Sequence, residues 1–397
     1  MPRRISFEIT LLYCTGMFAA MQLGLFGPMV PALQMAFDSD KASIALASSL
    51  ITGAGACCGI FAGAWIAQVG YKRALIIGSA LMIAGMVGVS FSPNLMFLYA
   101  CRFFSGFGYL IVVTACPGLM CALVSGRLLN LVMGFWGTFV PVGVAIGAWL
   151  SGALVERYGW EMVTLLSILP CALALVGLFF LESPTQPSRT MRLGQAIMPT
   201  LRNPSARYVS IAFSLFAGAT QAIALFLPST LIETGDWSLA NAATLVGIGS
   251  LVGGCIGSVL AGGLMARGWS GVTLFAAALV LLAIVSTTLL TGPGLAVAIL
   301  ATGLFFFGQG ICGGAGFALL PAVAAQGLTM AVLQGMFTHI NEIAVVAIPP
   351  VFGFTVDMHG WSGAAILALV VFALSLAAIL RFGVLTAQDR TAVTLSK

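Results

Sequence analysis

The sequence has very little charge. Only 7% of its 397 residues are Asp, Glu, Lys or Arg, while 60% are hydrophobic and the mean hydropathy is +1.11. A water-soluble domain of this length could not bury so much apolar surface, so the chain requires a lipid bilayer as its solvent. No G-x-x-x-x-G-K-[ST] phosphate-binding motif occurs, and none of the nine cysteines forms a C-x-x-C pair. We therefore expect no cofactor, no metal site and no catalytic domain outside the membrane.

Turns and charges divide the chain into twelve apolar segments. Most of them reach the roughly 20 residues that a helix needs to cross the hydrocarbon core. A transmembrane barrel would show alternating strands of about 10 residues instead. The sequence therefore predicts an all-α membrane protein with twelve transmembrane helices. The predicted spans are 9–33, 44–68, 74–91, 95–123, 128–154, 162–181, 209–232, 240–266, 272–290, 295–322, 330–356 and 364–382.

The positive charges are divided unequally between the two sides of these spans. If the N-terminus is cytoplasmic, thirteen of the sixteen Lys and Arg residues lie on the cytoplasmic side, Lys41 and Arg157 lie outside, and Arg102 lies within a span. Cytoplasmic loops of membrane proteins carry such an excess. We expect a multi-pass protein of the cytoplasmic (inner) membrane with both termini in the cytoplasm. The net charge of +5 then reports topology, and it requires no nucleic-acid partner.

The two halves of the chain repeat each other at an offset of 201 residues. The matched pairs are Gly134 with Gly335, Gly152 with Gly353, Glu156 with Asp357, Gly159 with Gly360 and Trp160 with Trp361. A repeat this long in so apolar a chain predicts two similar membrane bundles. We expect an N-terminal six-helix bundle at 1–181, a basic cytoplasmic linker at 182–208, and a C-terminal six-helix bundle with a short tail at 209–397.

Six plus six helices, a basic central loop and a cytoplasmic N-terminus resemble the major facilitator superfamily. The resemblance covers essentially the whole chain. It implies the major facilitator fold and a secondary transporter. The fourth span reads Arg102-Phe-Phe-Ser-Gly106-Phe-Gly108, which is similar to the family's R-x-x-x-G-x-G motif. The fifth span, with Gly137 and Pro141, loosely resembles the G-x-x-x-G-P motif of the drug–proton antiporters.

The loop between the second and third spans resembles the family's gating motif, G-x-x-x-D-x-x-G-R-K/R-x. Here Ala67 stands at the aspartate position and Tyr71 at the first basic position. The resemblance implies that the glycines let two helices approach and that the cations hold the cytoplasmic gate. The matching residues are Gly63, Gly70, Lys72 and Arg73.

Arg102 is predicted about seven residues into the fourth span, roughly 10 Å deep at 1.5 Å per residue. A charge at the bilayer centre costs about 2.5–3.5 kcal/mol, so it needs a partner, water or a function. Ser105, Tyr109 and Cys116 follow at helical spacing and form one polar stripe with it. We interpret Arg102 and Tyr109 as candidates for binding an anionic substrate or for proton coupling. Bracing of neighbouring helices is the alternative.

Glu342 is predicted near the middle of the eleventh span, and His339 precedes it by three residues on the same face. Asn341 is adjacent but points away by about 100° around the helix. The repeat places Thr138 opposite His339 and Pro141 opposite Glu342, so only the second half carries these polar groups. We interpret Glu342, His339 and Asn341 as a proton carrier or a substrate clamp. A buried hydrogen-bonded pair that fixes helix packing is the alternative.

Three glutamines lie within predicted spans: Gln22 in the first, Gln221 in the seventh and Gln309 in the tenth. The resemblance implies that spans one, four, seven and ten line the cavity. Each glutamine could therefore hydrogen-bond a substrate. Each could equally join two helices, with a gain of about 0.6 kcal/mol.

These observations predict a secondary active transporter, not an enzyme, that moves a small organic solute by alternating access. Glu342 favours proton coupling, with another coupling ion as the alternative. Arg102 and the incomplete antiporter motif favour import of an organic anion. Proton-driven efflux of drugs or metabolites, a non-transporting membrane sensor, and transport of a soft metal (from M-x-x-x-M spacings) are the other hypotheses. The expected partners are a small-molecule substrate, protons and membrane lipid, and the expected oligomeric state is a monomer.

Overall fold

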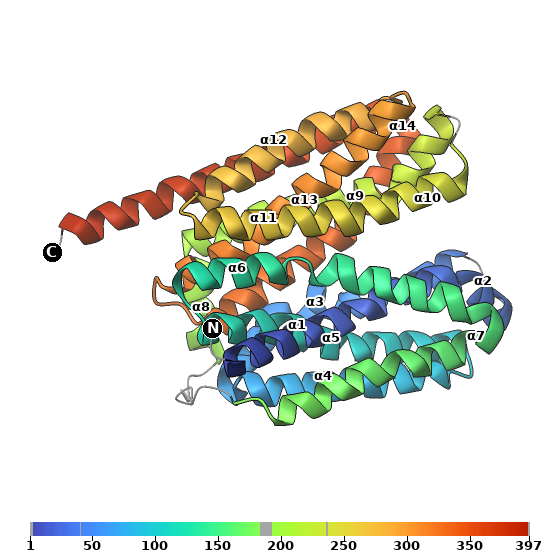
Figure 1. Ribbon diagram of the computed structural model, residues 1–397, viewed down its shortest axis with the longest axis horizontal. Helices are drawn as coiled ribbons and strands as arrows, with labels where there is room; N and C mark the ends of the chain where they lie inside the picture. Colours follow the sequence, from blue (N-terminus) through green and yellow to red (C-terminus); the bar gives the residue numbers. More distant parts are fainter. Residues whose placement is uncertain (1–2, 40, 183–192, 236, 396–397) are drawn as a thin grey trace. The chain divides into compact units, whose positions relative to one another are not determined.

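The computed structural model describes residues 3–39, 41–182, 193–235 and 237–395, and all of its regular structure there is helical (Figure 1). The helices of the first half are α1 (Arg3–Gly24), α2 (Phe26–Phe37), α3 (Lys41–Val69), α4 (Tyr71–Ser90), α5 (Leu95–Leu123), α6 (Gly126–Trp136) and α7 (Phe139–Phe179).

The helices of the second half begin with α8 (Leu193–Arg202), which lies inside the predicted linker. The other helices are α9 (Pro204–Gly235), α10 (Leu239–Ile248), a π-helical turn (Gly249–Gly253), α11 (Gly254–Ala266), α12 (Gly271–Leu290), α13 (Leu295–Ala324) and α14 (Met330–Leu395). The all-α prediction is confirmed.

Within the described residues, nine helical stretches are long and apolar enough to cross a membrane. A tenth is added if α1 and α2, which meet at a bend of 43°, are counted as one span. Two of the nine stretches are 54 and 59 residues long, at Gly126–Phe179 and Met330–Gln388. Since one crossing needs roughly 20 residues, each of these two is long enough for two crossings. The count of twelve spans stays a prediction.

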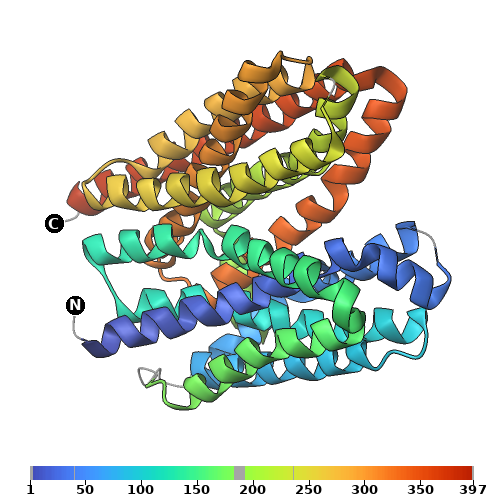
Figure 2. The same ribbon diagram turned by 45° about the vertical axis from the view of Figure 1, so that its right-hand side comes forward.

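The backbone repeats where the sequence does. Helix α7 reverses direction at Gly159 and α14 at Gly360, where the φ angles are 80° and 66°. Figure 2 shows both helices folding back on themselves. Positive φ is accessible to glycine without the penalty that a Cβ atom brings. The two positions differ by 360 − 159 = 201 residues, which is the offset of the sequence repeat.

The fifth and eleventh predicted spans differ in continuity. The fifth is interrupted between Trp136 and Phe139, where α6 ends and α7 begins, whereas α14 runs through the matching region without a break. Pro141 explains the interruption, because a proline has no N–H to donate and its ring clashes with the carbonyl four residues earlier, here that of Gly137. The repeat places Glu342 at the matching position of α14, so no proline disturbs that helix there.

The described helices group into two units, each of which takes one short segment from the other half of the sequence. Unit 1 contains Met1–Ser125, Phe139–Ile197 and Thr329–His339. Unit 2 contains Gly126–Thr138, Met198–Leu328 and Ile340–Lys397. The exchanged segments end at Thr138 and His339, which again differ by 339 − 138 = 201 residues. The predicted domain boundaries at 181 and 209 remain a prediction from the sequence.

Each exchanged segment is held by glycine contacts within its unit. In unit 1, a Cβ atom added to Gly63 would lie 2.9 Å from the Cα of Gly335. In unit 2, a Cβ atom added to Gly134 would lie 2.6 Å from the Cα of Gly262. Backbones this close leave no room for a side chain, as expected for small residues at membrane helix interfaces. The repeat therefore conserves a packing mode as well as a sequence pattern.

Candidate functional site

Arg102 is completely enclosed in unit 1. Its side chain has no exposed surface and lies on α5 among α1, α3 and α4. The guanidinium carbon lies 4.0 Å from the centre of the Phe26 ring, which places the cation over the aromatic face. This apolar surrounding gives the charge no contact with bulk water.

Hydrogen bonds within unit 1 use all the donors of Arg102. Its Nε donates to the Ala47 carbonyl (3.1 Å), and Nη2 donates to the carbonyls of Ser48 (3.1 Å) and Gln22 (3.5 Å). Its Nη1 donates to the Gln22 carbonyl (3.4 Å) and to the Met86 sulfur (3.8 Å). Five bonds match the five N–H groups of a guanidinium. The arrangement favours the bracing interpretation, because no donor is left to bind a substrate.

Gln22 belongs to the same buried network. Its side chain has no exposed surface and bridges α1 to α7, where Nε2 donates to the Ser167 carbonyl and the Cys171 sulfur, both at 3.5 Å. The Ser167 hydroxyl donates back to Oε1 of Gln22 at 3.4 Å. Tyr109, seven residues after Arg102 on α5, is also buried, at 5% exposure. Sequence reasoning selected these side chains for their polarity, and the structure places them inside the helix packing.

The gating-motif residues lie at the α3–α4 turn. Gly70 is the turn residue before α4, with a φ angle of 86°. Lys72 Nζ donates to the Phe179 carbonyl at 2.8 Å and so ties the start of α4 to the end of α7. Tyr71, which replaces a basic residue of the motif, is buried and packs against Gly118 of α5. Arg73 is exposed.

His339 packs against α3 in unit 1. Its Nδ1 lies 3.2 Å from the Gly55 carbonyl oxygen, and a Cβ atom added to Gly59 would lie 2.7 Å from its Cα. Gly55, Gly59 and Gly63 follow one another every four residues on α3, and this G-x-x-x-G-x-x-x-G spacing is a sequence signal of close packing that we had not assigned to His339. The expected partner of His339 was Glu342, and the partner in the structure is a backbone carbonyl of α3.

Glu342 lies three residues further along α14 and belongs to unit 2. Its side chain is 7% exposed, and no Lys or Arg among the described residues lies within ion-pair distance of it. The Asn341 amide is within hydrogen-bonding range of the Glu342 carboxyl, although helical geometry directs the two Cα–Cβ bonds about 100° apart. The Asn341 Oδ1 atom is buried and has no hydrogen-bond partner among the described residues.

The two glutamines of unit 2 have different environments. Gln309 of α13 donates from Nε2 to the hydroxyl of Thr220 on α9 at 3.5 Å, and Gln221 is exposed. One turn before Gln221, a Cβ atom added to Gly218 would lie 2.8 Å from the Ala344 carbonyl oxygen, which brings α9 close to α14 just after Glu342. Unit 2 therefore gathers Gln309, Asn341 and Glu342 on helices that pack around α9.

Sequence reasoning missed Thr220 and Ser258. Ser258 of α11 donates its hydroxyl to the Gly134 carbonyl at 2.7 Å and holds α6 in unit 2. Neither residue has a motif, since a lone hydroxyl in an apolar helix usually bonds to its own backbone. Within the part of the chain that the structure describes, no three His, Cys, Asp or Glu residues are grouped as they would be to hold a metal ion.

A family model described as Major Facilitator Superfamily matches residues 12–340. The chain belongs to this superfamily. The match ends two residues before Glu342, so Asn341 and Glu342 lie beyond the part that the family model covers. With its apolar helices, the chain is a multi-pass membrane protein and a transporter, not an enzyme.

Two curated relatives and one solved structure illustrate the range of the superfamily. The chain is 26% identical over 157 residues to the galactose-proton symporter of Escherichia coli, which covers 38% of this chain and 34% of that protein. It is 28% identical over 135 residues to the methyl viologen resistance protein SmvA of Salmonella typhimurium, which covers 33% of this chain and 27% of that protein. The matched parts thus span about a third of each relative's length.

The structural similarity extends over nearly the whole chain. The E. coli fucose:proton symporter FucP superimposes with a TM-score of 0.80 at 16% identity, over 96% of this chain and 99% of that chain. At this identity the match establishes the fold alone.

Proposed function

We propose that this superfamily member is a proton-coupled importer of a small organic solute and that Glu342 gains and loses the proton. The observation that carries the proposal is a buried carboxyl group without a cationic partner among the described residues. A charged side chain at the centre of a membrane helix costs about 2.5–3.5 kcal/mol. Proton binding removes this charge, so the protonation of Glu342 can be coupled to its access to water.

Asn341 suits both states of such a group. Its amide nitrogen can donate to a carboxylate, and its Oδ1 atom can accept from a carboxylic acid. That Oδ1 atom is the buried acceptor without a partner. The fold itself does not demand either residue, because the repeat places Val140 and Pro141 at the matching positions of the first half.

His339 and the gating-motif residues are proposed to act at the α3–α14 packing surface. His339 contributes to this surface through its Nδ1 atom, which lies 3.2 Å from the Gly55 carbonyl oxygen. The Gly63–Gly335 approach fixes the same surface, and Gly70 and Lys72 fix the turn beyond it. We propose that this surface loosens during alternating access.

The proposed class of solute is wider than the organic anions that Arg102 suggested from the sequence. An organic anion was predicted from a guanidinium free to bind it, and here that guanidinium is hydrogen-bonded within unit 1. Among the predicted site residues of unit 2, Gln221 is exposed and Gln309 and Asn341 are half-buried, and all three would hydrogen-bond a neutral or an anionic solute. Efflux is the second candidate function, favoured by the similarity to SmvA.

The test uses the purified chain in proteoliposomes with an imposed proton gradient. A thermal-shift screen with a hexose, an aromatic carboxylate and methyl viologen, at two pH values, selects the solute. A gradient worth 100 mV supplies about 2.3 kcal/mol per proton, which allows about 40-fold accumulation. We expect Glu342→Gln to abolish accumulation while leaving solute exchange without a gradient, and Glu233→Gln, at an exposed acid, to leave accumulation intact. Full accumulation by Glu342→Gln would refute the proton assignment.

A further inference from the structure

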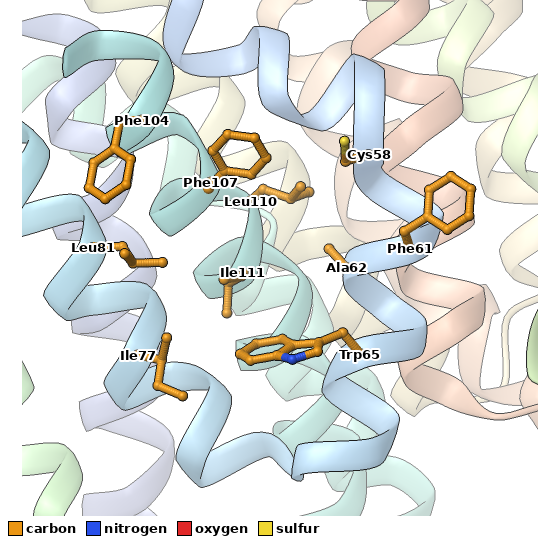
Figure 3. Close-up of a pocket in the computed structure, with 10 residues that line it drawn as sticks. All are labelled: Cys58, Phe61, Ala62, Trp65, Ile77, Leu81, Phe104, Phe107, Leu110 and Ile111. Carbon is orange, nitrogen blue, oxygen red and sulfur yellow. The ribbon is translucent and has the colours of Figure 1, made fainter. Parts of the chain in front are cut away.

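A cavity of about 420 Å³ lies between α3, α4 and α5 in unit 1, and no site described above uses it. All ten side chains that line it are apolar or weakly polar (Figure 3). Ala62 is the smallest of them, so the α3 wall recedes at that point. Apart from the indole N–H of Trp65, the lining offers no group that would hydrogen-bond a polar solute.

The cavity opens on the exposed surface of the bundle. Three of its lining residues have large exposed fractions, namely 58% for Phe61, 44% for Phe104 and 40% for Ile77. Exposed apolar side chains at the depth of membrane-spanning helices contact lipid acyl chains. The space between them is therefore open to hydrocarbon.

One end of the cavity has the chemistry of a membrane interface. Figure 3 shows Trp65 and Ile77 at the lower end of the cavity and Phe104 at the upper end, with the indole nitrogen on the lower edge of the Trp65 ring. Trp65 lies four residues before the end of α3 at Val69. Tryptophan favours this level of a membrane protein because its ring is apolar and its N–H needs a polar partner.

A free cation stands one turn beyond that end. Arg73, Ile77 and Leu81 are four residues apart on α4, so they share one face, and the last two line the cavity. The rise from Arg73 to Ile77 is about 6 Å. Arg73 is exposed, and no described residue forms a hydrogen bond or ion pair with it, whereas its neighbour Lys72 is bonded to the Phe179 carbonyl.

A second apolar cavity, in unit 2, provides the contrast. It measures about 620 Å³ and lies between α12 and the last part of α14. It has no tryptophan, and no Lys or Arg lies within four residues of any of its lining residues along the chain. The unit 2 cavity thus lacks an indole at its end, and its nearest basic residue along the chain is Arg381, five residues after Leu376.

We propose that the α3–α4–α5 groove binds one acyl chain of an anionic phospholipid, with its phosphate on Arg73 and its ester region at the Trp65 indole. An acyl chain gains little free energy by leaving the bilayer for an equally apolar groove. The acyl chain therefore only has to match the shape of the groove, and the phosphate determines which lipid is preferred. A guanidinium binds a phosphate through charge-assisted hydrogen bonds. The lipid is therefore selected by its headgroup charge.

The test measures quenching of Trp65 by lipids with brominated acyl chains, in nanodiscs containing mainly phosphatidylcholine. The emission of Trp65 is obtained as the difference between the wild type and Trp65→Phe. We expect brominated phosphatidylglycerol to quench it at a lower mole fraction than brominated phosphatidylcholine. Arg73→Gln should weaken the phosphatidylglycerol preference about fivefold, which corresponds to roughly 1 kcal/mol. Arg267→Gln, at an exposed arginine outside unit 1, should leave it unchanged.

Variants that fill the groove test the contribution of the acyl chain to binding separately from that of the headgroup. Ala62→Leu should reduce quenching by both lipids, and Ile77→Phe, at a partly exposed position, is the substitute if the first variant does not fold. Ala283→Leu, in the unit 2 cavity, is the matched control and should change neither. Equal quenching by the two lipids in the wild type, or equal losses in Arg73→Gln and Arg267→Gln, would overturn the proposal. No transport is needed for this measurement, so its outcome does not depend on the proposed function.

Discussion

Each unit buries a charged side chain that has no ion-pair partner among the described residues, and the two units do so differently. Arg102 in unit 1 has no exposed surface, donates all its N–H groups to carbonyls and a sulfur, and lies over an aromatic ring. Glu342 in unit 2 is 7% exposed, has no cationic partner among the described residues, and is near an amide oxygen without a partner. Burying a charge is unfavourable in both units. In unit 1 the hydrogen bonds of Arg102 offset this cost, whereas in unit 2 Glu342 can avoid it by binding a proton.

The comparison separates a structural charge from a functional one by its remaining hydrogen-bonding capacity. Burial alone would not separate them, because both side chains are almost completely enclosed. A group whose donors are all used can only hold its neighbours in place. A group with an unused partner nearby can change its protonation state or its ligand.

The largest expected effect on stability comes from Arg102. Arg102→Ala should lower the free energy of unfolding by about 2–4 kcal/mol, because it leaves a cavity among α1, α3 and α4 and removes five hydrogen bonds. Glu342→Gln should change it by less than about 1 kcal/mol. Denaturant unfolding in mixed micelles measures both values. If Arg102→Ala unfolds like the wild type but no longer binds the solute, the assignment of roles to the two residues is reversed.

A smaller effect is expected at the glycine contact beside His339. Gly335→Leu places a side chain against Gly59 and Gly63 of α3, and such overpacking costs about 1–3 kcal/mol. The same substitution at Gly303, where an added Cβ atom meets nothing within 4 Å, is the control and should cost less than about 1 kcal/mol. Thermal unfolding followed by circular dichroism compares the two. Equal losses of stability in the two variants would contradict the close packing of α3 against α14 at Gly335.

The smallest expected effect is that of Gln309 in unit 2, which is compared with that of Gln22 in unit 1. Gln22→Ala should cost about 1–3 kcal/mol, since it removes the buried hydrogen bonds that join α1 to α7. Gln309→Ala should cost about 0.6 kcal/mol, the typical value of a hydrogen bond between membrane helices. Solute affinity is measured alongside stability, and only Gln309→Ala is expected to lower it. A loss of affinity in Gln22→Ala alone would contradict the assignment of Gln22 to packing.

The family and the all-helical fold could be predicted from the sequence because both depend on local or periodic sequence patterns. Apolar runs predict spans, and the 201-residue offset predicts the duplication, down to Gly159 and Gly360. The environment of Arg102 could not be predicted in this way. Its partners come from residues 16 to 80 positions away, and nothing in their own sequence marks a carbonyl as an acceptor. Position along a helix gives depth in the membrane but does not say which helices surround it.

The partners of the polar residues of α14 could not be predicted from their positions in the sequence either. Helical spacing predicts His339 and Glu342 on one face, but His339 lies beside a carbonyl of α3, and the side chain that bonds to Glu342 is Asn341 of the same helix. For His339 the G-x-x-x-G-x-x-x-G spacing on α3 was available as a signal, because close backbone approach leaves carbonyls near a neighbouring side chain. For Thr220 and Ser258 the sequence contains no comparable signal.

The reversals at Gly159 and Gly360 have a practical consequence for topology mapping. Each joins two long helices through a single residue, so an epitope tag inserted there would unwind helical turns on both sides. The four-residue connections at 91–94 and 291–294 are real loops and would accept a reporter more easily. Reporters at those two sites, paired with ones beside Gly70 and Gly268, would assign each of these four connections to one side of the bilayer or the other.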